Sequence, residues 1–279
     1  MQDAFNLGWK LATVLRGLAG PELLHSYSDE RQAIAKELID FDREFATMFS
    51  ARPKASEDDA EGIDPAEFQR YFVKQGRFTA GTATRYRLSA LTGDGEHQAM
   101  APGFPVGMRF HSAPIIRLAD AKPMHLGHVA EADGRWRLYL FAGADGISPG
   151  SRLARICDWL EADAASPLRA HTPEGENVDG VLDVRAVLQE PHQGLSMDDL
   201  PGLLWPRKGR FGLRDYEKSF CADPVTDIYD ARCIDRIQGC MVVVRPDQYV
   251  AEVLPLDATA ALTDYFAGVL TARPALVAA

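Results

Sequence analysis

Residues 1–15 combine a narrow polar stripe with a broad apolar surface. Polar side chains recur every three or four residues, which is helical spacing: Asp3, Asn6, Lys10 and Thr13. Apolar side chains fill most of the positions between them, and a helix that is apolar around most of its circumference belongs inside a larger body. The pattern therefore predicts a helix at the start of the chain whose apolar surface needs to be covered.

A longer amphipathic helix is expected over residues 21–50. This stretch contains no glycine and no proline after Pro21, and its apolar residues keep helical spacing throughout. The sequence Ser-Asp-Glu-Arg that begins at Ser28 resembles a second N-cap, so we expect an interruption of the helix there.

Residues 52–62 are acidic and contain no large apolar side chains, which predicts a mobile loop. Asp64 then precedes Pro65, which places an N-cap residue before a proline at the first helical position. A short helix from Pro65 to about Gln75 is therefore expected. No stretch before residue 101 has the pattern of a strand.

The pattern changes near residue 101 to short β-type runs separated by turns. Residues 135–141 alternate in character after an Ala-Asp-Gly turn, which predicts the outgoing strand of a hairpin. The remaining expected elements are an amphipathic helix over 151–163, a strand over 178–189, two strands joined by a turn over 239–256, and a final helix capped by Asp257 or Thr259.

The order of these elements favours an α/β fold. Helices come first, and then strand, helix, strand, strand pair and helix follow, which is consistent with a thioredoxin-like central sheet that has helices on both faces. We expect two parts: residues 1–100, which are mainly helical, and residues 101–279, which contain the sheet.

The composition is that of a globular protein, because the 279 residues are 46% hydrophobic and 25% charged. The formal net charge of −10 argues against binding to nucleic acid through bulk electrostatics. No apolar run is long enough to span a bilayer, and Asp3 and Lys10 interrupt the pattern that a secretory signal requires. We therefore expect a cytoplasmic protein with neither a nucleic-acid nor a membrane partner.

No two of the four cysteines have Cys-x-x-Cys spacing: they are Cys157, Cys221, Cys233 and Cys240. Neither a zinc ribbon nor a thioredoxin-type redox pair is therefore expected, and the thiols are expected to be reduced. Cys157 lies on the apolar face of its helix and is expected in the core. Cys233 and Cys240 fall near neighbouring strands, so a disulfide between them stays an alternative.

Two groups of residues invite a chemical role and also have a structural explanation. His125 and His128 have no evident third metal ligand, so no metal site is expected. Asp215, Glu217 and Lys218 are expected to form a surface ion pair or a dimer contact rather than an acid–base cluster.

Structural roles are also expected for residues of the predicted strands. Arg245 and Asp247 are expected to fix the turn between the last two strands, because an Asp side chain bonds the backbone two residues further on. Aromatic side chains on a strand are more often core than binding residues. Trp136, Tyr139 and Phe141 are therefore expected in the core.

Six segments, spread over nearly the whole chain, carry a family resemblance. They are MQDAFNLGWKLATVLRG, LLHSYSDERQAIAKELIDFDREF, APGFPVGMRF, EADGRWRLYLFAG, DYEKSF and VVVRPDQYVAEVLPLDA. Together they resemble the flavin-dependent aromatic hydroxylases, in the phenol 2-monooxygenase branch that includes the 3-hydroxybenzoate 4-monooxygenase-like enzymes.

This resemblance implies that residues 1–100 are the helical end of an FAD-binding domain together with its linker. Residues 101–279 would be a thioredoxin-like dimerisation domain, and the protein would be a homodimer. The implied cofactor is FAD, with NADPH as the co-substrate that reduces it. The implied reaction is the hydroxylation of a phenolic small molecule.

The Gly-x-Gly-x-x-Gly turn with which the family holds FAD is absent from the sequence. Met1 is therefore expected to be an internal methionine of a longer enzyme, and the chain alone to be catalytically incompetent. In the complete enzyme the first helix would point its N-terminus toward the flavin, which makes Gln2 and Asp3 the cofactor-facing residues. A plain helix start, with Asp3 as a first-turn acid, is the structural alternative.

The first helix would then lack the walls that cover it in the complete enzyme. We expect its large apolar side chains to face water in part and to promote association: Phe5, Trp9, Leu11 and Leu15. Replacing Trp9 together with Leu11 is expected to leave the sheet-containing part folded.

Two further functions are open at this point. The chain by itself would be a non-catalytic dimerisation or scaffold module. A stand-alone thioredoxin-like redox protein is the other alternative, and the missing Cys-x-x-Cys pair counts against it. No catalytic residue is assigned from the sequence.

Overall fold

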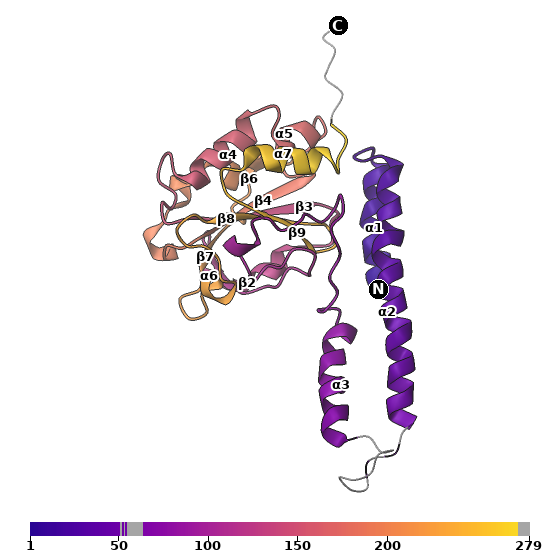
Figure 1. Ribbon diagram of the computed structural model, residues 1–279. Helices are drawn as coiled ribbons and strands as arrows, with labels where there is room; N and C mark the ends of the chain where they lie inside the picture. Colours follow the sequence, from indigo (N-terminus) through magenta and orange to yellow (C-terminus); the bar gives the residue numbers. More distant parts are fainter. Residues whose placement is uncertain (51, 53, 55–63, 273–279) are drawn as a thin grey trace.

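The computed structural model of the chain describes residues 1–50, 52, 54 and 64–272. A central β-sheet and the helices that cover it form one body, and the N-terminal helices run along one side of this body (Figure 1). This arrangement confirms the predicted α/β fold class. The loop predicted over residues 52–62 lies almost entirely outside the described residues.

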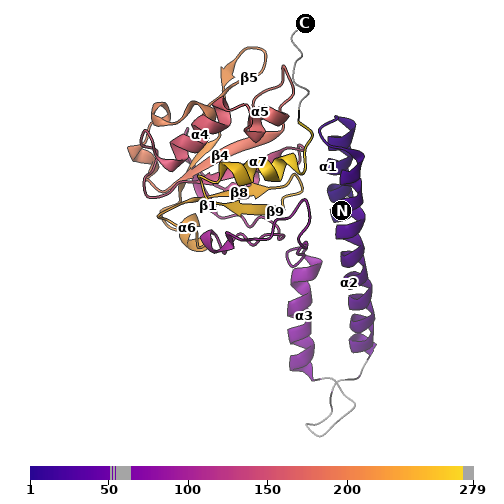
Figure 2. The ribbon, with the colours of Figure 1, turned by 45° about the horizontal axis from the view of Figure 1, so that its top comes forward.

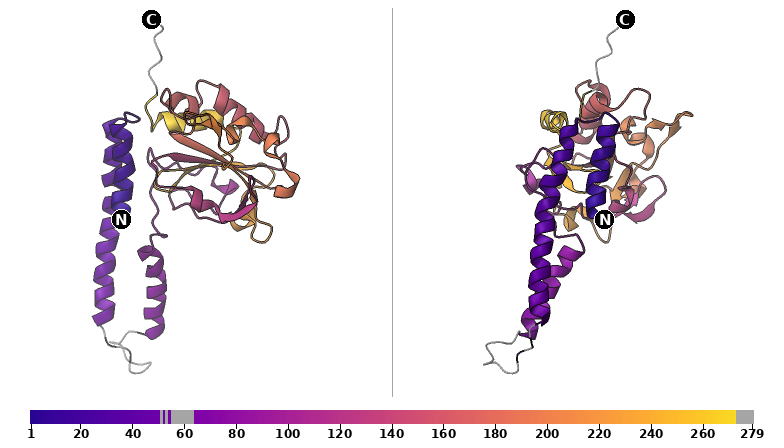
Figure 3. Two further views of the ribbon diagram at one scale, coloured as in Figure 1. Left: turned by 180° about the vertical axis from the view of Figure 1, so that it is seen from behind. Right: turned by 90° about the vertical axis from the view of Figure 1, so that its right-hand side faces the viewer.

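Three long helices precede the sheet. α1 (Gln2–Leu15) and α2 (His25–Ser50) are antiparallel neighbours, and α3 (Pro65–Thr79) returns beside the far half of α2 (Figure 3). Phe41 of α2 stacks on Tyr71 of α3, with their ring centroids 6.2 Å apart. α2 and α3 therefore form a two-helix arm that extends beyond the sheet body.

The predicted start of α3 is confirmed, whereas the interruption predicted in α2 is absent. Asp64 caps α3, where its Oδ1 accepts a hydrogen bond from the amide of Ala66 at 2.8 Å. A 3-10 turn, Pro21–Leu24, precedes α2, and α2 then passes through Ser28 without the predicted interruption. The prediction at Ser28 is wrong because Glu30, which would stand in the first turn after a cap, is instead buried against neighbouring elements.

A mixed sheet of seven strands is the centre of the molecule. Its strands are β1 (Pro114–Arg117), β2 (Lys122–His125), β3 (Trp136–Phe141), β4 (Leu182–Leu188), β7 (Ser219–Ala222), β8 (Cys240–Val244) and β9 (Val250–Leu254). Their order across the sheet is β2-β1-β7-β4-β3-β8-β9. β3 pairs in parallel with β4 and antiparallel with β8. A separate ladder joins β5 (Arg207–Lys208) to β6 (Leu213–Arg214).

Helices cover both faces of the sheet. α4 (Arg152–Ala162), α5 (Pro167–His171) and α7 (Thr259–Ala267) lie on one face, and the short α6 (Ile228–Ala231) lies on the other (Figure 1). β3, α4, β4, the β8–β9 hairpin and α7 follow the predicted order of elements. The thioredoxin-like assignment and the division near residue 100 stay predictions. Within the described residues, no helix is both long enough and apolar enough to cross a membrane.

β3 does not form a hairpin with the chain before it, so that prediction is wrong. The strand lies inside the sheet and is buried on both faces. The side chain of Asp133, in the Ala-Asp-Gly turn, accepts hydrogen bonds from the amide of Arg135 at 3.0 Å and from Nη2 of Arg137 at 2.7 Å. The turn therefore leads the chain into the sheet without pairing β3 to the preceding strand, β2.

The predicted side-chain cap of the last helix is also wrong. α7 begins with Ala258 at its N-cap and without a capping side chain. The carbonyl of Asp257 instead accepts a hydrogen bond from the amide of Thr259 at 2.9 Å, so a backbone turn takes the place of the cap. α4 does have a side-chain cap, because Oγ of Ser151 accepts a hydrogen bond from the amide of Ala154 at 3.2 Å.

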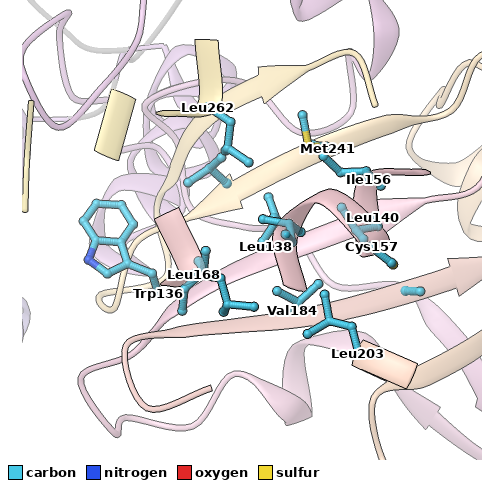
Figure 4. Close-up of a cluster of buried hydrophobic side chains, with 14 of the residues drawn as sticks. Trp136, Leu138, Leu140, Ile156, Cys157, Leu168, Val184, Leu203, Met241 and Leu262 are labelled. Atoms are coloured by element: carbon cyan, nitrogen blue, oxygen red, sulfur yellow. The ribbon is translucent and has the colours of Figure 1, made fainter. Parts of the chain in front are cut away.

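Apolar side chains fill both faces of the sheet. On the face below α4, α5 and α7, Leu138 and Leu140 of β3 belong to one cluster with Ile156 of α4 and Met241 of β8 (Figure 4). Neighbouring residues of β3 point to the opposite face and join a second cluster. The predicted core residues are all buried: Trp136, Tyr139, Phe141 and Cys157.

α1 lies with its polar stripe toward the body. Asn6, Lys10 and Thr13 are buried, whereas Leu11 and Leu15 are exposed at 42% and 78%. The predicted helix and the predicted exposure of Leu11 and Leu15 to water are confirmed, whereas the burial of the polar stripe was not predicted. The reason is that the elements below α1 offer charged groups to the polar stripe.

Trp9 is the apolar exception on the buried side of α1. Its ring meets Trp136 of β3 edge-on, with the centroids 5.7 Å apart, and it belongs to the main core cluster. This position argues against the expectation that Trp9 is dispensable for the sheet-containing part.

We predict that Trp9→Ala lowers the free energy of unfolding by about 3–5 kcal/mol, because it leaves a cavity beside Trp136. Leu11→Ala, on the exposed side of the same helix, is the control and is expected to change it by no more than about 0.5 kcal/mol. Urea unfolding followed by circular dichroism measures both values. Equal effects of the two substitutions would contradict the orientation of α1.

Candidate functional site

The start of α1 is where the sequence places the cofactor-facing residues. α1 begins at Gln2, with Met1 at the N-cap and without a capping side chain. The first amide N–H groups of a helix have no partner inside the helix, and they carry a partial positive charge. These groups therefore suit an acceptor or an anion that approaches the start of α1.

The two predicted site residues have different surroundings. The side chain of Gln2 lies against Gly81, where a Cβ atom would overlap its amide nitrogen. Asp3 accepts a hydrogen bond from Nε of Arg31 at 2.7 Å, and this bond is the main cause that lowers the pKa of Asp3. Asp3 therefore joins α1 to α2.

Arg31 connects this end of α1 to the sheet-containing part. Its buried guanidinium also donates a hydrogen bond to the hydroxyl of Tyr86 at 3.3 Å. Tyr86 packs on Tyr249, with ring centroids 4.4 Å apart, and burial raises the pKa of its hydroxyl. Contacts that reach the sheet-containing part thus fix the position of Asp3 and of the first turn of α1.

A cavity of about 750 Å³ adjoins the start of α1. Most of the lining side chains are apolar, among them Met1, Phe5 and Leu38, and the polar ones are Gln2, Arg31, Thr84 and Arg109. A mainly apolar cavity with a few polar groups is typical of small-molecule sites. Gln2 lines this cavity and Asp3 does not, so the structure separates the two residues that the sequence placed together.

Four buried charges meet where the polar stripe of α1 contacts the rest of the molecule, and one of them, Lys10, belongs to the stripe. Glu30 accepts hydrogen bonds from Nζ of Lys10 at 2.7 Å and from Nη2 of Arg245 at 2.9 Å. Asp247 accepts a hydrogen bond from Nε of Arg245 at 3.0 Å. Nδ2 of Asn6 donates to Glu30 at 2.8 Å and to Asp247 at 3.2 Å. The two cations and two carboxylates cancel, and we call these five residues the α1–hairpin cluster.

The members of this cluster hold one another in their charged forms. Burial alone would raise the pKa of Glu30, but Arg245 and Lys10 outweigh burial and lower it to about 2. Burial lowers the pKa of Lys10, and Glu30 acts against that change. Burial also opposes the charge of Arg245, but Asp247 and Glu30 raise its pKa above the ordinary value. Removing one partner would leave a buried charge unpaired, which is strongly destabilising.

The roles expected of Arg245 and Asp247 are only partly right. Both residues belong to the turn between β8 and β9, but the Asp247 carboxylate bonds Arg245 and Asn6 instead of the nearby backbone. The backbone closes the turn, because the amide of Gln248 donates to the carbonyl of Arg245 at 2.9 Å. The polar stripe of α1 was a signal for a polar partner, but nothing in the sequence identified Glu30, which lies 215 residues from Arg245.

His125 and His128 lie close together at the end of β2. His125 ends that strand and His128 lies in the 3-10 turn that follows, with the ring centroids 5.8 Å apart. Across residues 1–50, 52, 54 and 64–272, no group of three or more His, Cys, Asp or Glu side chains is arranged to hold a metal ion.

Lys218 is buried, so the surface ion pair predicted for it is wrong. Its Nζ donates hydrogen bonds to Asp179 at 2.7 Å and to Asp183 at 2.6 Å, and both carboxylates are buried as well. Asp215 lies beside them and accepts a hydrogen bond from Lys208 at 3.1 Å. The cause is the pairing of β7 with β4, which brings Lys218 next to the strand that carries Asp183.

The cysteines are free thiols, so the alternative of a disulfide between Cys233 and Cys240 is wrong. Cys233 is exposed and Cys240 is buried. Burial raises the pKa of Cys221 to about 12 and also raises the pKa of Cys157 and of Cys240. Because the thiolate is the reactive form, these three cysteines are unsuited to redox exchange.

Comparison with known protein families shows to which family this chain belongs. The family described as "Phenol hydroxylase, C-terminal dimerisation domain" matches residues 84–274. The chain belongs to the phenol hydroxylase dimerisation-domain family. The family described as "FAD binding domain" matches residues 1–42, which cover α1 and the first part of α2. The matched phenol hydroxylase region includes every strand of the seven-stranded sheet.

Relatives of this phenol hydroxylase family member confirm the resemblance seen in its sequence. The chain is 57% identical over 270 residues to 3-hydroxybenzoate 4-monooxygenase of Comamonas testosteroni, covering 95% of this chain and 42% of that protein. It is 35% identical over 274 residues to the FAD-dependent monooxygenase terD of Aspergillus terreus, covering 95% of this chain and 44% of that protein. The chain therefore spans less than half the length of these relatives.

Solved structures share the fold. The flavin-dependent monooxygenase PieE, in complex with FAD and substrate, aligns with a TM-score of 0.53 at 21% identity, over 95% of this chain and 43% of that one. Aklavinone-11 hydroxylase, in complex with FAD and aklavinone, also aligns with a TM-score of 0.53, at 19% identity, over 96% of this chain and 39% of that one. At these identities the likeness establishes the fold alone.

The lowered pKa of Glu30 makes the stability of the protein dependent on pH. Because this pKa moves from its ordinary value of 4.5 to about 2, the Glu30 charge stabilises the folded state fully above the ordinary value. That contribution is lost as the pH falls toward 2. We predict that Glu30→Gln lowers the free energy of unfolding at neutral pH by roughly 3 kcal/mol, and that its difference from the wild type shrinks in acid.

Urea unfolding at a series of pH values measures this difference. Glu37→Gln, an exposed position on the same helix, is the matched control and is expected to follow the wild type at every pH. A difference between Glu30→Gln and the wild type that stays constant from neutral pH into acid would contradict the charged state of Glu30.

Proposed function

We propose that this chain forms the C-terminal part of a cytoplasmic FAD-dependent, NADPH-using monooxygenase that hydroxylates phenolic small molecules. The observation that carries this proposal is the 57% identity to 3-hydroxybenzoate 4-monooxygenase over 95% of the chain. The two family matches support the same assignment.

In this proposal residues 1–100 are the helical end of the FAD-binding domain, and residues 101–279 are a thioredoxin-like dimerisation domain. α1 exposes an apolar side that includes Leu7, Leu11 and Leu15. An exposed apolar stripe of this kind marks an interaction surface. We assign it as the surface that packs against the remainder of the FAD-binding domain.

The residues at the start of α1 fit an electron-rich part of a flavin. The first amide groups have no side-chain cap, and the adjoining cavity is lined by Gln2 and by Arg109, which adds positive charge there. When bound, FAD supplies the redox chemistry that allows oxygen to enter an aromatic ring. Gln2 and the first amide groups of α1 would hold the electron-rich edge of FAD, and Asp3 would keep α1 aligned with α2 through Arg31.

The proposed assembly is a homodimer, which the description of residues 84–274 as a dimerisation domain supports. The chain alone is proposed to be a non-catalytic dimerisation module, since its sequence lacks the Gly-x-Gly-x-x-Gly turn. Three buried cysteines with raised pKa values speak against the alternative of a thioredoxin-like redox protein: Cys157, Cys221 and Cys240.

Flavin binding tests the proposal. We predict that the purified chain is colourless and does not oxidise NADPH. A chimera in which this chain replaces the matching part of the Comamonas testosteroni 3-hydroxybenzoate 4-monooxygenase is expected to bind FAD and to hydroxylate 3-hydroxybenzoate with NADPH. Absorbance of bound flavin and product analysis measure both outcomes.

Two results would contradict the proposal: a stoichiometric flavin band in the chain alone, or a folded chimera that binds no FAD. Within the chimera, Gln2→Ala tests the site residue and is expected to weaken FAD binding about tenfold, as the loss of one hydrogen bond does. Glu37→Ala, on the exposed side of α2, is the matched control.

A further inference from the structure

Residues 205–216, which contain β5 and β6, form a short hairpin at the edge of the body, and Figure 2 shows β5 at the upper edge of the view. We call this segment the 205–216 hairpin. Three of its side chains are large, apolar and exposed: Phe211 at 72%, Leu213 at 69% and Tyr216 at 44%. A group of exposed apolar side chains on one element is typical of a protein contact surface.

The base of the 205–216 hairpin is anchored to the body. Nζ of Lys208 donates hydrogen bonds to the buried Asp179 at 2.6 Å and to Asp215 at 3.1 Å. The amide of Gly209 donates to Oδ1 of Asn177 at 2.7 Å. The exposed side chains therefore stand on a fixed base, so that binding a partner through them requires little ordering of the hairpin.

Aromatic rings and guanidinium groups contact one another along the hairpin. The guanidinium of Arg210 lies 4.5 Å from the ring centroid of Phe211, and that of Arg214 lies 4.1 Å from the ring centroid of Trp205. Tyr216 stacks on the same Trp205 ring, with the ring centroids 6.2 Å apart. Aromatic and arginine side chains are the residue types that are enriched at the energetic centres of protein interfaces.

The hairpin is cationic in an acidic protein. Arg207 and Arg214 donate hydrogen bonds to backbone carbonyls, and in the part of the chain that the structure describes neither they nor Arg210 form an ion pair. The chain as a whole carries a formal net charge of −10. The hairpin therefore attracts acidic surface, which is the kind that predominates on a second copy of this acidic chain.

We propose that the 205–216 hairpin is the surface through which one copy of this chain binds a second copy. The inference rests on the proposed homodimer and assigns its contact surface. The hairpin lies inside the region that matches a dimerisation domain, residues 84–274. The other large exposed apolar side chains of that region lie singly on separate segments: Leu88, Val225 and Ile237.

Analytical ultracentrifugation of the purified chain tests the assignment. The variant Phe211→Asp with Leu213→Asp is expected to raise the dimer dissociation constant at least about 100-fold, because it places like charges where two apolar anchors are buried. Val225→Asp, exposed at 91% in the same region, is the matched control and is expected to dimerise as the wild type does. Circular dichroism confirms that each variant is folded.

The possible failures are distinguishable. A monomeric wild type would overturn the proposed homodimer and this assignment with it. A dimeric wild type whose dissociation constant does not differ between the hairpin variant and Val225→Asp would overturn the assignment alone. Dissociation by Leu11→Asp, with no effect of the hairpin variant, would place the contact on α1 and also overturn it.

Discussion

The α1–hairpin cluster decides where the first helix lies. Lys10, Glu30, Arg245 and Asp247 are all buried, and burying charges is tolerated only when each one is paired and hydrogen-bonded. Moving α1 along the β8–β9 turn would break several of these bonds at once, so the cluster allows one position of the helix. The Arg245 guanidinium also lies 5.6 Å from the ring centroid of Trp9, which ties the charges to the apolar core.

This constraint has a functional consequence. Because the polar stripe of α1 is bound to the body, the apolar side of the helix faces outward, the reverse of an ordinary surface helix. Both family matches supply residues to this cluster. Asn6, Lys10 and Glu30 lie in the matched residues 1–42, and Arg245 and Asp247 lie in the matched residues 84–274. In the proposed monooxygenase, buried ion pairs and the Trp9 contact would therefore set the position of the flavin-facing first turn relative to the dimerisation domain.

Elements defined by local pattern could be predicted, and arrangements that depend on distant partners could not. The helical periodicity of residues 21–50 predicted α2. The two apolar runs on either side of the β8–β9 turn predicted the hairpin of these strands. The burial of Lys218 and the inward polar stripe of α1 depend on carboxylates far away in the sequence. Gln2 was predicted near a cofactor only because of the family resemblance. No pattern in the sequence indicates the cavity that Gln2 lines or its contact with Gly81.

Native-state hydrogen exchange of the α1 amides tests most directly whether the cluster makes this helix part of the sheet body. If it does, the amides over residues 6–13 exchange with the same free energy of opening as those of β3 and β8, since all of them open in one cooperative unit. Exchange of the α1 amides through a local opening of much lower free energy, while β3 and β8 stay protected, would contradict the account.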